Sequence, residues 1–256
     1  MVLKIYFNSR LAKSHIQDSP AKRFQVIKMF LGTPEDKAHP TASGGGPSRL
    51  KLAYLRPAYQ PNGAALLLKR SFDIVFSLTI IIFGAPVFLA LFLITWFSSP
   101  GPVFYTQERV GRHQRTFKIY KFRSMRVNAE QGIPQLSSAN DPRVTRWGRI
   151  IRRTRLDELP QFWNVIKGDM SIVGPRPERA YFIQQILNNR PDYHKLHSVR
   201  PGITSYGQVK FGYAEDVEQM CTRMEYDLDY LHRMSFYTDV RLILKTVKVM
   251  VMCKGK

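Results

Sequence analysis

The chain has 256 residues and a formal net charge of +20 at pH 7, from 39 lysines and arginines against 19 aspartates and glutamates. This length leaves room for one domain and an appended segment, and the charge makes an anionic partner the first expectation, whether nucleic acid, anionic lipid headgroups or phosphorylated substrates. Two cysteines, Cys221 and Cys253, provide neither a disulfide framework nor metal-ligand spacing, which fits a reducing location that faces the cytoplasm.

The first 62 residues differ in composition from the rest of the chain. Residues 33–49 are rich in Pro, Gly, Ser, Thr and Ala and offer almost nothing that a core could bury. We therefore predict a flexible tail and linker over residues 1–62, with no visible motif, and one domain over residues 63–256.

Residues 74–97 form an apolar run without a charged residue, with Pro86 near its middle. As one straight helix the run would measure about 36 Å, enough to cross a hydrocarbon core of about 30 Å. A core helix of a soluble protein is a poor alternative for so long an uncharged stretch.

Lysines and arginines, which mark the cytoplasmic side of a membrane segment, flank this run at both ends: Arg49, Lys51, Arg56, Lys69 and Arg70 before it, and Arg109, Arg112, Arg115, Lys118, Lys121 and Arg123 after it. A central proline removes a backbone donor and breaks the helix, and Gly84 lowers helix propensity further. We favour a re-entrant helix-break-helix over a span, although length alone also permits a span.

The segment after the run predicts a small β-hairpin. Residues 103–108 and 116–123 alternate and are rich in Val, Phe, Tyr and Thr, with Gly111 at the turn between them. Helices are expected over 177–189 and 215–234, which makes the fold mainly α with a small β-hairpin, an α+β arrangement. Residues 239–253 have the amphipathic pattern of a helix in the membrane interface, and a core helix of a soluble bundle would look similar.

The densest chemical stretch is RLDELPQFWNVIKGDMSIVGPRPE, residues 155–178. Asp157 is suited to cap a helix that runs to about residue 166 and that Gly168 ends, and adjacent carboxylates at a helix start usually do no more than cap. Here, however, Arg152 lies just upstream, and Arg176 stands between two prolines that restrict its backbone. A fixed arginine beside Asp157 and Glu158 is suited to hold a metal-bridged diphosphate.

Several long motifs then occur in a characteristic order: KRSFDIVFS, SPGPVFYTQERVG, FKIYKFRSM, NDPRVTRWGRIIRRTRLDELPQFWNVIKGDMSIVGPRPE, RPGIT and YDLDYL. In these motifs the chain resembles the bacterial sugar transferase family, the monotopic phosphoglycosyl transferases, over about residues 66–254. The resemblance implies transfer of a sugar 1-phosphate from a UDP-sugar to undecaprenyl phosphate, with release of UMP, as the first membrane step of a surface glycan. It also implies a location at the cytoplasmic face of the bacterial inner membrane.

The resemblance further implies site residues. The membrane helix would break at Ala85-Pro86, and the Asp157-Glu158 pair would act with Mg²⁺. Asp157 would attack the phosphate next to the sugar and form a covalent intermediate. The residues that match family positions for phosphate binding are Arg152, Arg176 and Arg200, with Lys121 a weaker candidate, and Asp169 matches a position whose role stays open.

Two departures bear on this interpretation. Ala85 stands where many relatives have Ser, which leaves the proline break intact, and Ser205-Tyr206 stand where Gly and a large apolar residue are commoner, which leaves the sugar open. The segment GYAEDVEQM resembles exopolysaccharide-initiating members, which favours a hexose over an N-acetylated sugar. The oligomeric state, with a homo-oligomer among the options, also stays open.

Two rival interpretations remain. A basic nucleic-acid-binding protein would explain the charge but neither the apolar run nor the carboxylate pair, so we expect no nucleic acid partner. A catalytically silent membrane scaffold would need the apolar run but not Asp157. Turnover of a UDP-sugar to UMP distinguishes the scaffold from the enzyme.

Overall fold

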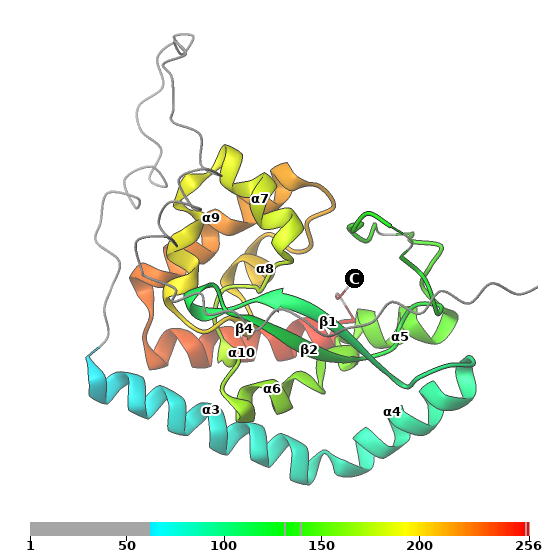
Figure 1. Cartoon of the computed structure of the whole chain (residues 1–256). Helices are drawn as coiled ribbons and strands as arrows, with labels where there is room; N and C mark the ends of the chain where they lie inside the picture. The colour runs from blue at the N-terminus through cyan, green and yellow to red at the C-terminus, as the bar shows by residue number, and fades with distance from the viewer. Residues whose placement is uncertain (1–61, 131, 139, 254, 256) are drawn as a thin grey trace, which may run out of the picture. The chain divides into compact units, whose positions relative to one another are not determined.

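The computed structural model describes residues 62–256 apart from 131, 139, 254 and 256, so the predicted tail over 1–62 lies outside the described residues except for Asn62. The described chain is mainly helical and has two small sheets of two strands each (Figure 1). Its elements are α3 (Gly63–Phe83), α4 (Ala85–Ser98), β1 (Phe104–Val110), the 3-10 helix η1 (Arg112–Gln114), β2 (Thr116–Phe122), α5 (Arg146–Arg153), the 3-10 helix η2 (Leu156–Glu158), α6 (Gln161–Lys167), β3 (Ser171–Val173), α7 (Ala180–Asn189), the 3-10 helix η3 (Pro191–Ser198), β4 (Gly202–Thr204), α8 (Tyr206–Lys210), α9 (Val217–Arg233) and α10 (Phe236–Val251). The prediction of an α+β fold is confirmed for this part of the chain.

The apolar run forms two helices that meet at an angle. Helix α3 ends at Phe83, α4 begins at Ala85 with Pro86 in its first turn, and the pair is bent by 63°. Gly84 fits at the bend because a Cβ there would lie 2.3 Å from the carbonyl oxygen of Ile80. No single described helix is both long and apolar enough to cross a bilayer, whereas the bent pair meets both conditions when taken together. The predicted break at Ala85-Pro86 is therefore confirmed as a feature of the helix pair.

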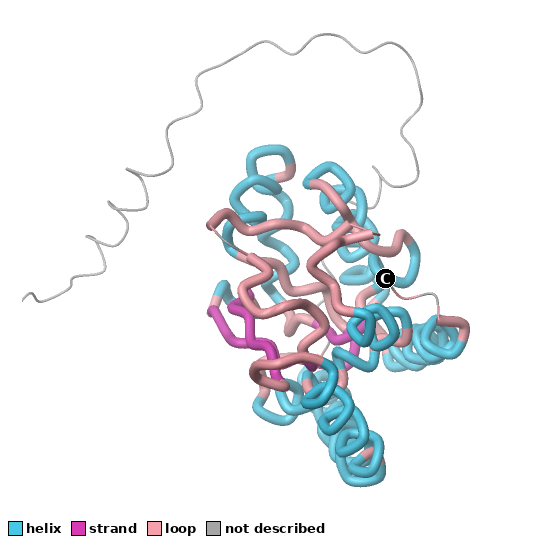
Figure 2. Tube along the Cα trace, turned by 90° about the vertical axis from the view of Figure 1, so that its right-hand side faces the viewer, coloured by secondary structure: helices cyan, strands magenta, loops and turns pink. Residues whose placement is uncertain are grey.

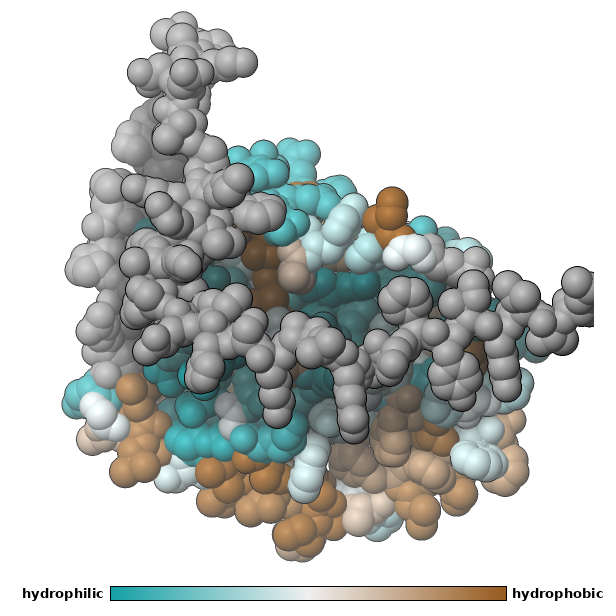
Figure 3. Space-filling view, viewed as in Figure 1, coloured by the Kyte–Doolittle hydropathy of each residue, from teal (hydrophilic) through white to brown (hydrophobic). Residues whose placement is uncertain are grey.

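The outward side of this helix pair is apolar, and its inward side contains buried polar groups. Phe83 and Phe97, which are 80% and 81% exposed, are the extremes of an exposed apolar surface along both helices, visible as the brown lower face in Figure 3. Ser77 and Thr95 are fully buried against the rest of the chain. A continuous exposed apolar surface marks a contact site, either for a membrane or for another protein.

Polar contacts fasten α3 to the body of the protein. The ammonium group of Lys69 donates to Asp239 on α10, with Nζ 2.5 Å from Oδ2, and the guanidinium of Arg70 donates to the last carbonyl oxygens of α6. Buried Asp73 accepts a hydrogen bond from the hydroxyl of Ser171 at 2.7 Å. These contacts fix the first half of α3 against α6, β3 and α10 along the lower side of the body (Figure 1, Figure 2).

A separate set of contacts fastens α4. The indole Nε1–H of Trp147 on α5 donates to the hydroxyl of buried Thr95, at 2.9 Å. At the exit from α4, the guanidinium of Arg123 donates to the carbonyl oxygen and hydroxyl of Ser99. Gly101, at φ +117°, leaves room for this arginine, because a Cβ there would lie 2.5 Å from its Nη1. Both arms of the bent pair are thus attached to one body.

We expect Trp147→Phe to destabilise the protein by about 1–3 kcal/mol, because it leaves the buried hydroxyl of Thr95 without its donor. The measurement is urea unfolding of the detergent-purified protein, followed by circular dichroism. Trp163→Phe is the control, since Trp163 is half exposed on α6 and its loss should cost less than about 0.5 kcal/mol. Equal stability of the Trp147 variant and the wild type would show that this contact does not hold α4.

The predicted β-hairpin is confirmed. Strands β1 and β2 pair antiparallel from Phe104 opposite Phe122 to Val110 opposite Thr116, with η1 at the turn. The sequence does not predict the second sheet, in which β3 and β4 pair parallel. The strands approach closely at Gly202, where a Cβ would lie 2.1 Å from the backbone nitrogen of Gly174. Position 202 therefore requires glycine.

The main core lies between these small sheets and the C-terminal helices. Its largest fully buried side chains come from β3, α6, α7 and α9 and include Val165, Met170, Val173, Ile186, Met220 and Tyr230. Helices α7 and α9 confirm the helices predicted over 177–189 and 215–234, with later starts. Helix α10 confirms a helix over the last segment, whose place in a membrane interface stays a prediction.

Candidate active site

A cleft of about 530 Å³ opens beside the β-hairpin. Side chains from β1, β2, the loop that follows β2, η2, the segment before α7 and α9 line it. Among the residues predicted for the site, those that line the cleft are Lys121, Arg152, Asp157, Glu158 and Arg176. The structure therefore brings these five residues, of which only Asp157 and Glu158 are adjacent in the sequence, to one surface.

The Asp157-Glu158 pair lies in the 3-10 turn η2, between α5 and α6. Arg155, which precedes the turn, adopts a left-handed conformation with φ 56° and reverses the chain direction. The prediction that Asp157 caps the following helix is wrong, since α6 begins at Gln161 after Pro160 and has no side-chain cap. Gly168, at φ 95°, ends α6 as predicted. The carboxylate of Asp157 is thus not used for capping.

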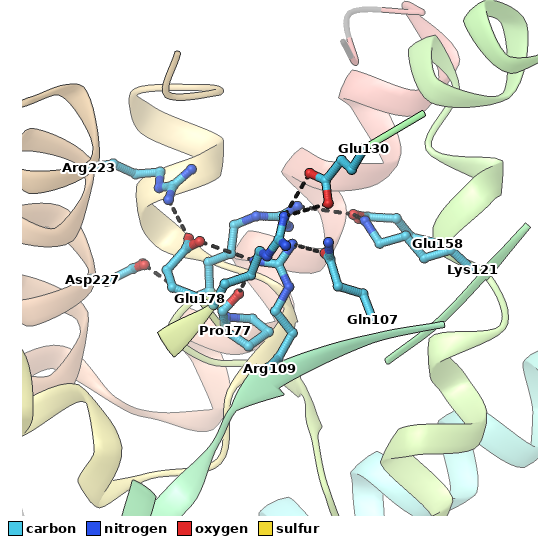
Figure 4. Close-up of polar contacts among 11 residues, drawn as sticks. Gln107, Arg109, Lys121, Glu130, Glu158, Pro177, Glu178, Arg223 and Asp227 are labelled. Carbon is cyan, nitrogen blue, oxygen red and sulfur yellow. Dashed lines mark hydrogen bonds and ion pairs between the residues drawn. The ribbon is translucent and has the colours of Figure 1, made fainter. Parts of the chain in front are cut away.

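Glu158 is the centre of a cationic cluster. Its Oε1 lies 2.8 Å from Nζ of Lys121 (Figure 4). The same oxygen lies 3.3 Å from Nη2 of Arg176, and Oε2 lies 3.9 Å from Nη1 of Arg155. Burial alone would raise the pKa of Glu158, but these three cations hold it well below its usual range. Burial lowers the pKa of Lys121, and Glu158 opposes that effect. Glu158 is therefore ionised, and two cations contact its Oε1, whereas its Oε2 has only the longer pair with Arg155.

Asp157 differs from its neighbour in its contacts and in the net direction of its pKa shift. It is buried and lines the cleft, and within the described residues it has neither a hydrogen bond nor an ion pair. Burial raises its pKa to about 6, and the nearby Lys121 limits the rise. Its carboxylate oxygens are therefore available to a ligand in the cleft, and they are more basic than those of an ordinary aspartate.

The backbone at Arg176 is fixed by the residues around it. Prolines flank it at positions 175 and 177, and its backbone N–H donates to Asp227 on α9 at 3.2 Å. Glu158 raises the pKa of its guanidinium against the effect of burial. The ring of Tyr213 lies beside it, with the ring centroid 5.9 Å from the guanidinium carbon of Arg176 and 5.3 Å from that of Arg155. Sequence reasoning missed Tyr213 and Asp227, because only the fold brings α9 and the preceding loop to this site.

The other end of the cleft carries further arginines, which sequence reasoning also missed. Glu178 accepts from both Arg109 on β1 and Arg223 on α9, and Arg179 pairs with Glu130 at 2.7 Å (Figure 4). Each of these three arginines is paired with a carboxylate, and Arg109 and Arg223 share one. The SPGPVFYTQERVG motif contains Arg109 and was the available signal for this end.

Of the three remaining predicted residues, one lines the cleft and two lie outside its lining. Arg152 lines the cleft, donates to the hydroxyl of Ser137 at 2.9 Å and has no carboxylate within ion-pair distance among the described residues. Arg200 does not line the cleft, and its Nε–H donates to the carbonyl oxygen of Gly168 at 3.0 Å. Asp169 also lies outside the cleft lining and pairs with Lys167 at 3.3 Å, which favours a structural role. Of these two arginines, only Arg152 therefore lines the cleft, and the phosphate-binding role of both stays a prediction.

The donor set at η2 is small but compatible with a divalent cation. No cluster of three or more His, Cys, Asp or Glu side chains occurs in the part of the chain that the structure describes. Mg²⁺ is commonly held by one or two carboxylates together with substrate phosphates. Asp157, with free oxygens, and Glu158 beside it provide the two carboxylates.

Comparisons with known proteins show the family to which the chain belongs. Residues 64–253 match the sequence profile of the family described as "Bacterial sugar transferase". The chain is 43% identical, over 75% of its length, to a UDP-N-acetylgalactosamine-undecaprenyl-phosphate N-acetylgalactosaminephosphotransferase of Aeromonas hydrophila and covers 45% of that protein. It is 41% identical, over 73% of its length, to a UDP-glucose:undecaprenyl-phosphate glucose-1-phosphate transferase of Escherichia coli K12 and covers 40% of it.

A shorter relative is covered almost completely. The exopolysaccharide production protein PSS of Rhizobium leguminosarum is 39% identical over 75% of the chain and 98% of its own length. The chain thus spans less than half of the first two relatives but nearly all of this third one.

Proposed function

Because the chain belongs to the bacterial sugar transferase family, we propose that it transfers a sugar 1-phosphate from a UDP-sugar to undecaprenyl phosphate. The products are a polyprenyl-diphosphate-linked sugar and UMP, and the reaction would begin assembly of an exopolysaccharide or another surface glycan. The names of the similar proteins support the reaction class. The observation that carries the proposal is the contrast at η2, where Glu158 is engaged by cations and Asp157 faces the cleft with free oxygens.

The two carboxylates suit different roles. An oxygen of Asp157 attacks the phosphorus that bears the sugar, the bond to the UMP oxygen breaks, and UMP leaves. An oxygen of the lipid phosphate then attacks the same phosphorus and releases Asp157, so that one difficult exchange becomes two easier ones. Asp157 suits this role better than Glu158, because its pKa of about 6 indicates a more basic carboxylate and no cation occupies its oxygens.

The charges at this end of the cleft favour the diphosphate. Four cations, Lys121, Arg152, Arg155 and Arg176, lie near only two carboxylates, Asp157 and Glu158. Arginine binds phosphate oxygens through paired hydrogen bonds. Asp157 and Glu158 would hold Mg²⁺, which would neutralise part of the diphosphate charge.

The identity of the sugar is tested directly by turnover. The names of similar proteins include N-acetylgalactosamine, glucose and galactose, and we propose a hexose, from the segment over residues 212–220. Purified protein is incubated with undecaprenyl phosphate and UDP-glucose, UDP-galactose or UDP-N-acetylgalactosamine, and UMP is measured. The proposal expects UMP with a UDP-hexose. Absence of UMP with every UDP-sugar would contradict the proposed reaction.

The proposal includes a monotopic location at the cytoplasmic face of the bacterial cytoplasmic membrane, with α3 and α4 as a re-entrant pair. Three observations support it: the outward apolar surface of the pair, the basic residues at both flanks, and the polar contacts that fasten both arms to one body. If α4 crossed the membrane away from this body, the hydroxyl of Thr95 would lose its indole donor in lipid.

Cysteine labelling in inverted and right-side-out vesicles tests this topology. Cys253, which is exposed, is first replaced by Ser, and single cysteines are introduced as Gly63→Cys at the first residue of α3 and Ile133→Cys in the exposed loop after β2. A membrane-impermeant maleimide is expected to label both positions only from the cytoplasmic side. Labelling of the two positions from opposite sides would establish a span.

A further inference from the structure

Arg200, which the family motif RPGIT provides, lies outside the cleft, and the proposed reaction leaves it without a role. At the C-terminal end of α6, Arg200 donates to the carbonyl oxygen of Gly168, and Arg70, in the first half of α3, donates to those of Val165 and Ile166. Arg112 in η1 donates to the carbonyl oxygen of Ser198, two residues before Arg200. Three arginines from separate elements are thus linked to this part of the chain. Because like charges repel, the closeness of these arginines needs a physical explanation.

Helix capping explains Arg70 but not the other two. Both terminal nitrogens of Arg70 donate to the carbonyl oxygens of Val165 and Ile166, as a cation at a helix C-terminus commonly does. Arg200 uses only Nε–H, toward Gly168, and Arg112 uses only Nε–H, toward the carbonyl oxygen of Ser198 at 3.1 Å. Within the described residues the terminal nitrogens of Arg112 and Arg200 have no acceptor, so four nitrogens remain for a ligand.

The cluster also lacks counter-charges. None of the three arginines forms an ion pair with a described carboxylate. Burial lowers the pKa of Arg200, and Arg70 and Arg112 lower it further, while Asp73 acts in the opposite direction. The oxygens of Asp73 already accept from the hydroxyl of Ser171 and the backbone of Ile172. An anion bound between the arginines would remove this repulsion.

The position of the cluster indicates the kind of anion. Arg70 lies one helical turn before the apolar run, and Leu67 and Leu68 beside it on α3 are exposed. Gly168, the acceptor of Arg200, lies against Arg70, since a Cβ there would be 3.6 Å from its Nη2. Hydrophilic surface borders the apolar underside at this end of α3 (Figure 3). A phosphodiester headgroup occupies this level in a membrane.

We propose that Arg112 and Arg200, supported by the charge of Arg70, bind the phosphate of an anionic phospholipid headgroup at the border between the body and the apolar helix pair. The proposal rests on the membrane location proposed above. The guanidinium fork matches phosphate oxygens, and a bound headgroup would fix the height of the cleft above the membrane surface. The site is separate from the cleft in which Asp157 lies.

Binding of short-chain phosphatidylglycerol to the full chain, purified in a zwitterionic detergent, tests the proposal, with short-chain phosphatidylcholine as the uncharged comparison. Wild type is expected to prefer phosphatidylglycerol. The double variant Arg112→Gln with Arg200→Gln is expected to bind it about a hundredfold more weakly, because two charge-assisted contacts are lost. The variant Arg112→Lys with Arg200→Lys keeps the charge and should retain part of the binding.

A matched variant, Arg149→Gln with Arg153→Gln on the exposed side of α5, removes the same charge elsewhere. It should bind phosphatidylglycerol as the wild type does. Equal losses in both glutamine variants would mean that binding follows total charge, and unchanged binding in the Arg112 and Arg200 variant would exclude the site.

A parallel loss of UMP formation with undecaprenyl phosphate would assign the cluster to the lipid substrate and overturn the phospholipid assignment. Failure of the proposed reaction would instead show as no UMP from the wild type, whatever the lipid binding.

Discussion

Asp157→Asn is expected to lower UMP formation by about ten-thousandfold or more, because an amide cannot act as the nucleophile. The same change should not weaken the fold. Burial raises the pKa of Asp157 to about 6, so in the folded protein the ionised form is disfavoured above the pKa of an unfolded aspartate. A neutral asparagine removes that penalty at neutral pH. Stability equal to or above that of the wild type, together with lost activity, would identify a chemical role for Asp157.

The covalent route has a direct readout. Without lipid phosphate, the wild type should release UMP in a single burst and retain radiolabel carried in the sugar after denaturation, whereas Asp157→Asn should do neither. Arg176→Ala is the comparison, because it removes one charge-assisted phosphate contact and should slow the reaction by roughly ten- to a hundredfold without abolishing labelling. If the wild type retains no label under fast quench and releases UMP only with lipid present, the lipid phosphate attacks directly and Asp157 is reduced to a metal ligand.

The sequence predicted the elements whose structure depends on neighbouring residues in the chain. The break at Ala85-Pro86 follows from the missing proline donor, and the β-hairpin follows from alternation around Gly111. Gly168 ends α6 because it adopts a left-handed conformation. The N-cap prediction for Asp157 failed because the left-handed Arg155 turns the chain first, and because the carboxylate pair is placed by contacts with β2 rather than by helix geometry.

The site itself depends on contacts between distant segments. The pairing of Glu158 with Lys121 joins η2 to β2, and that of Glu178 with Arg223 joins the segment before α7 to α9. No spacing in the sequence indicates either pair. The motif match selects both Arg176 and Arg200, but only Arg176 lines the cleft, because a motif gives the residue type and not the direction of its side chain. The sequence therefore indicates candidate residues, whereas the fold shows which of them line one cleft and what surrounds them.

Glu158→Gln is expected to destabilise the protein by about 3–5 kcal/mol, because it leaves buried cations without their counter-charge. Lys121 and Arg176 share one oxygen of Glu158, and Arg155 lies near the other. Urea unfolding at neutral pH measures the loss. Glu225→Gln is the matched control, since its pair with Arg190 is partly exposed and should contribute about 1 kcal/mol or less. A Glu158 variant as stable as the control would show that the cations do not depend on this carboxylate.

A second substitution separates the structural role of Glu158 from its chemical role. In Lys121→Met with Glu158→Gln, the cation closest to the lost carboxylate is also removed, so more than half of the lost stability should return. Activity should not return, because the cleft has then lost both a phosphate-binding cation and a carboxylate able to hold Mg²⁺. Recovery of both properties would mean that the pair matters only for folding, and recovery of neither would mean that Arg155 and Arg176 alone account for the cost. Stability without turnover is the result expected if the cationic cluster holds Glu158 in place for chemistry carried out at Asp157.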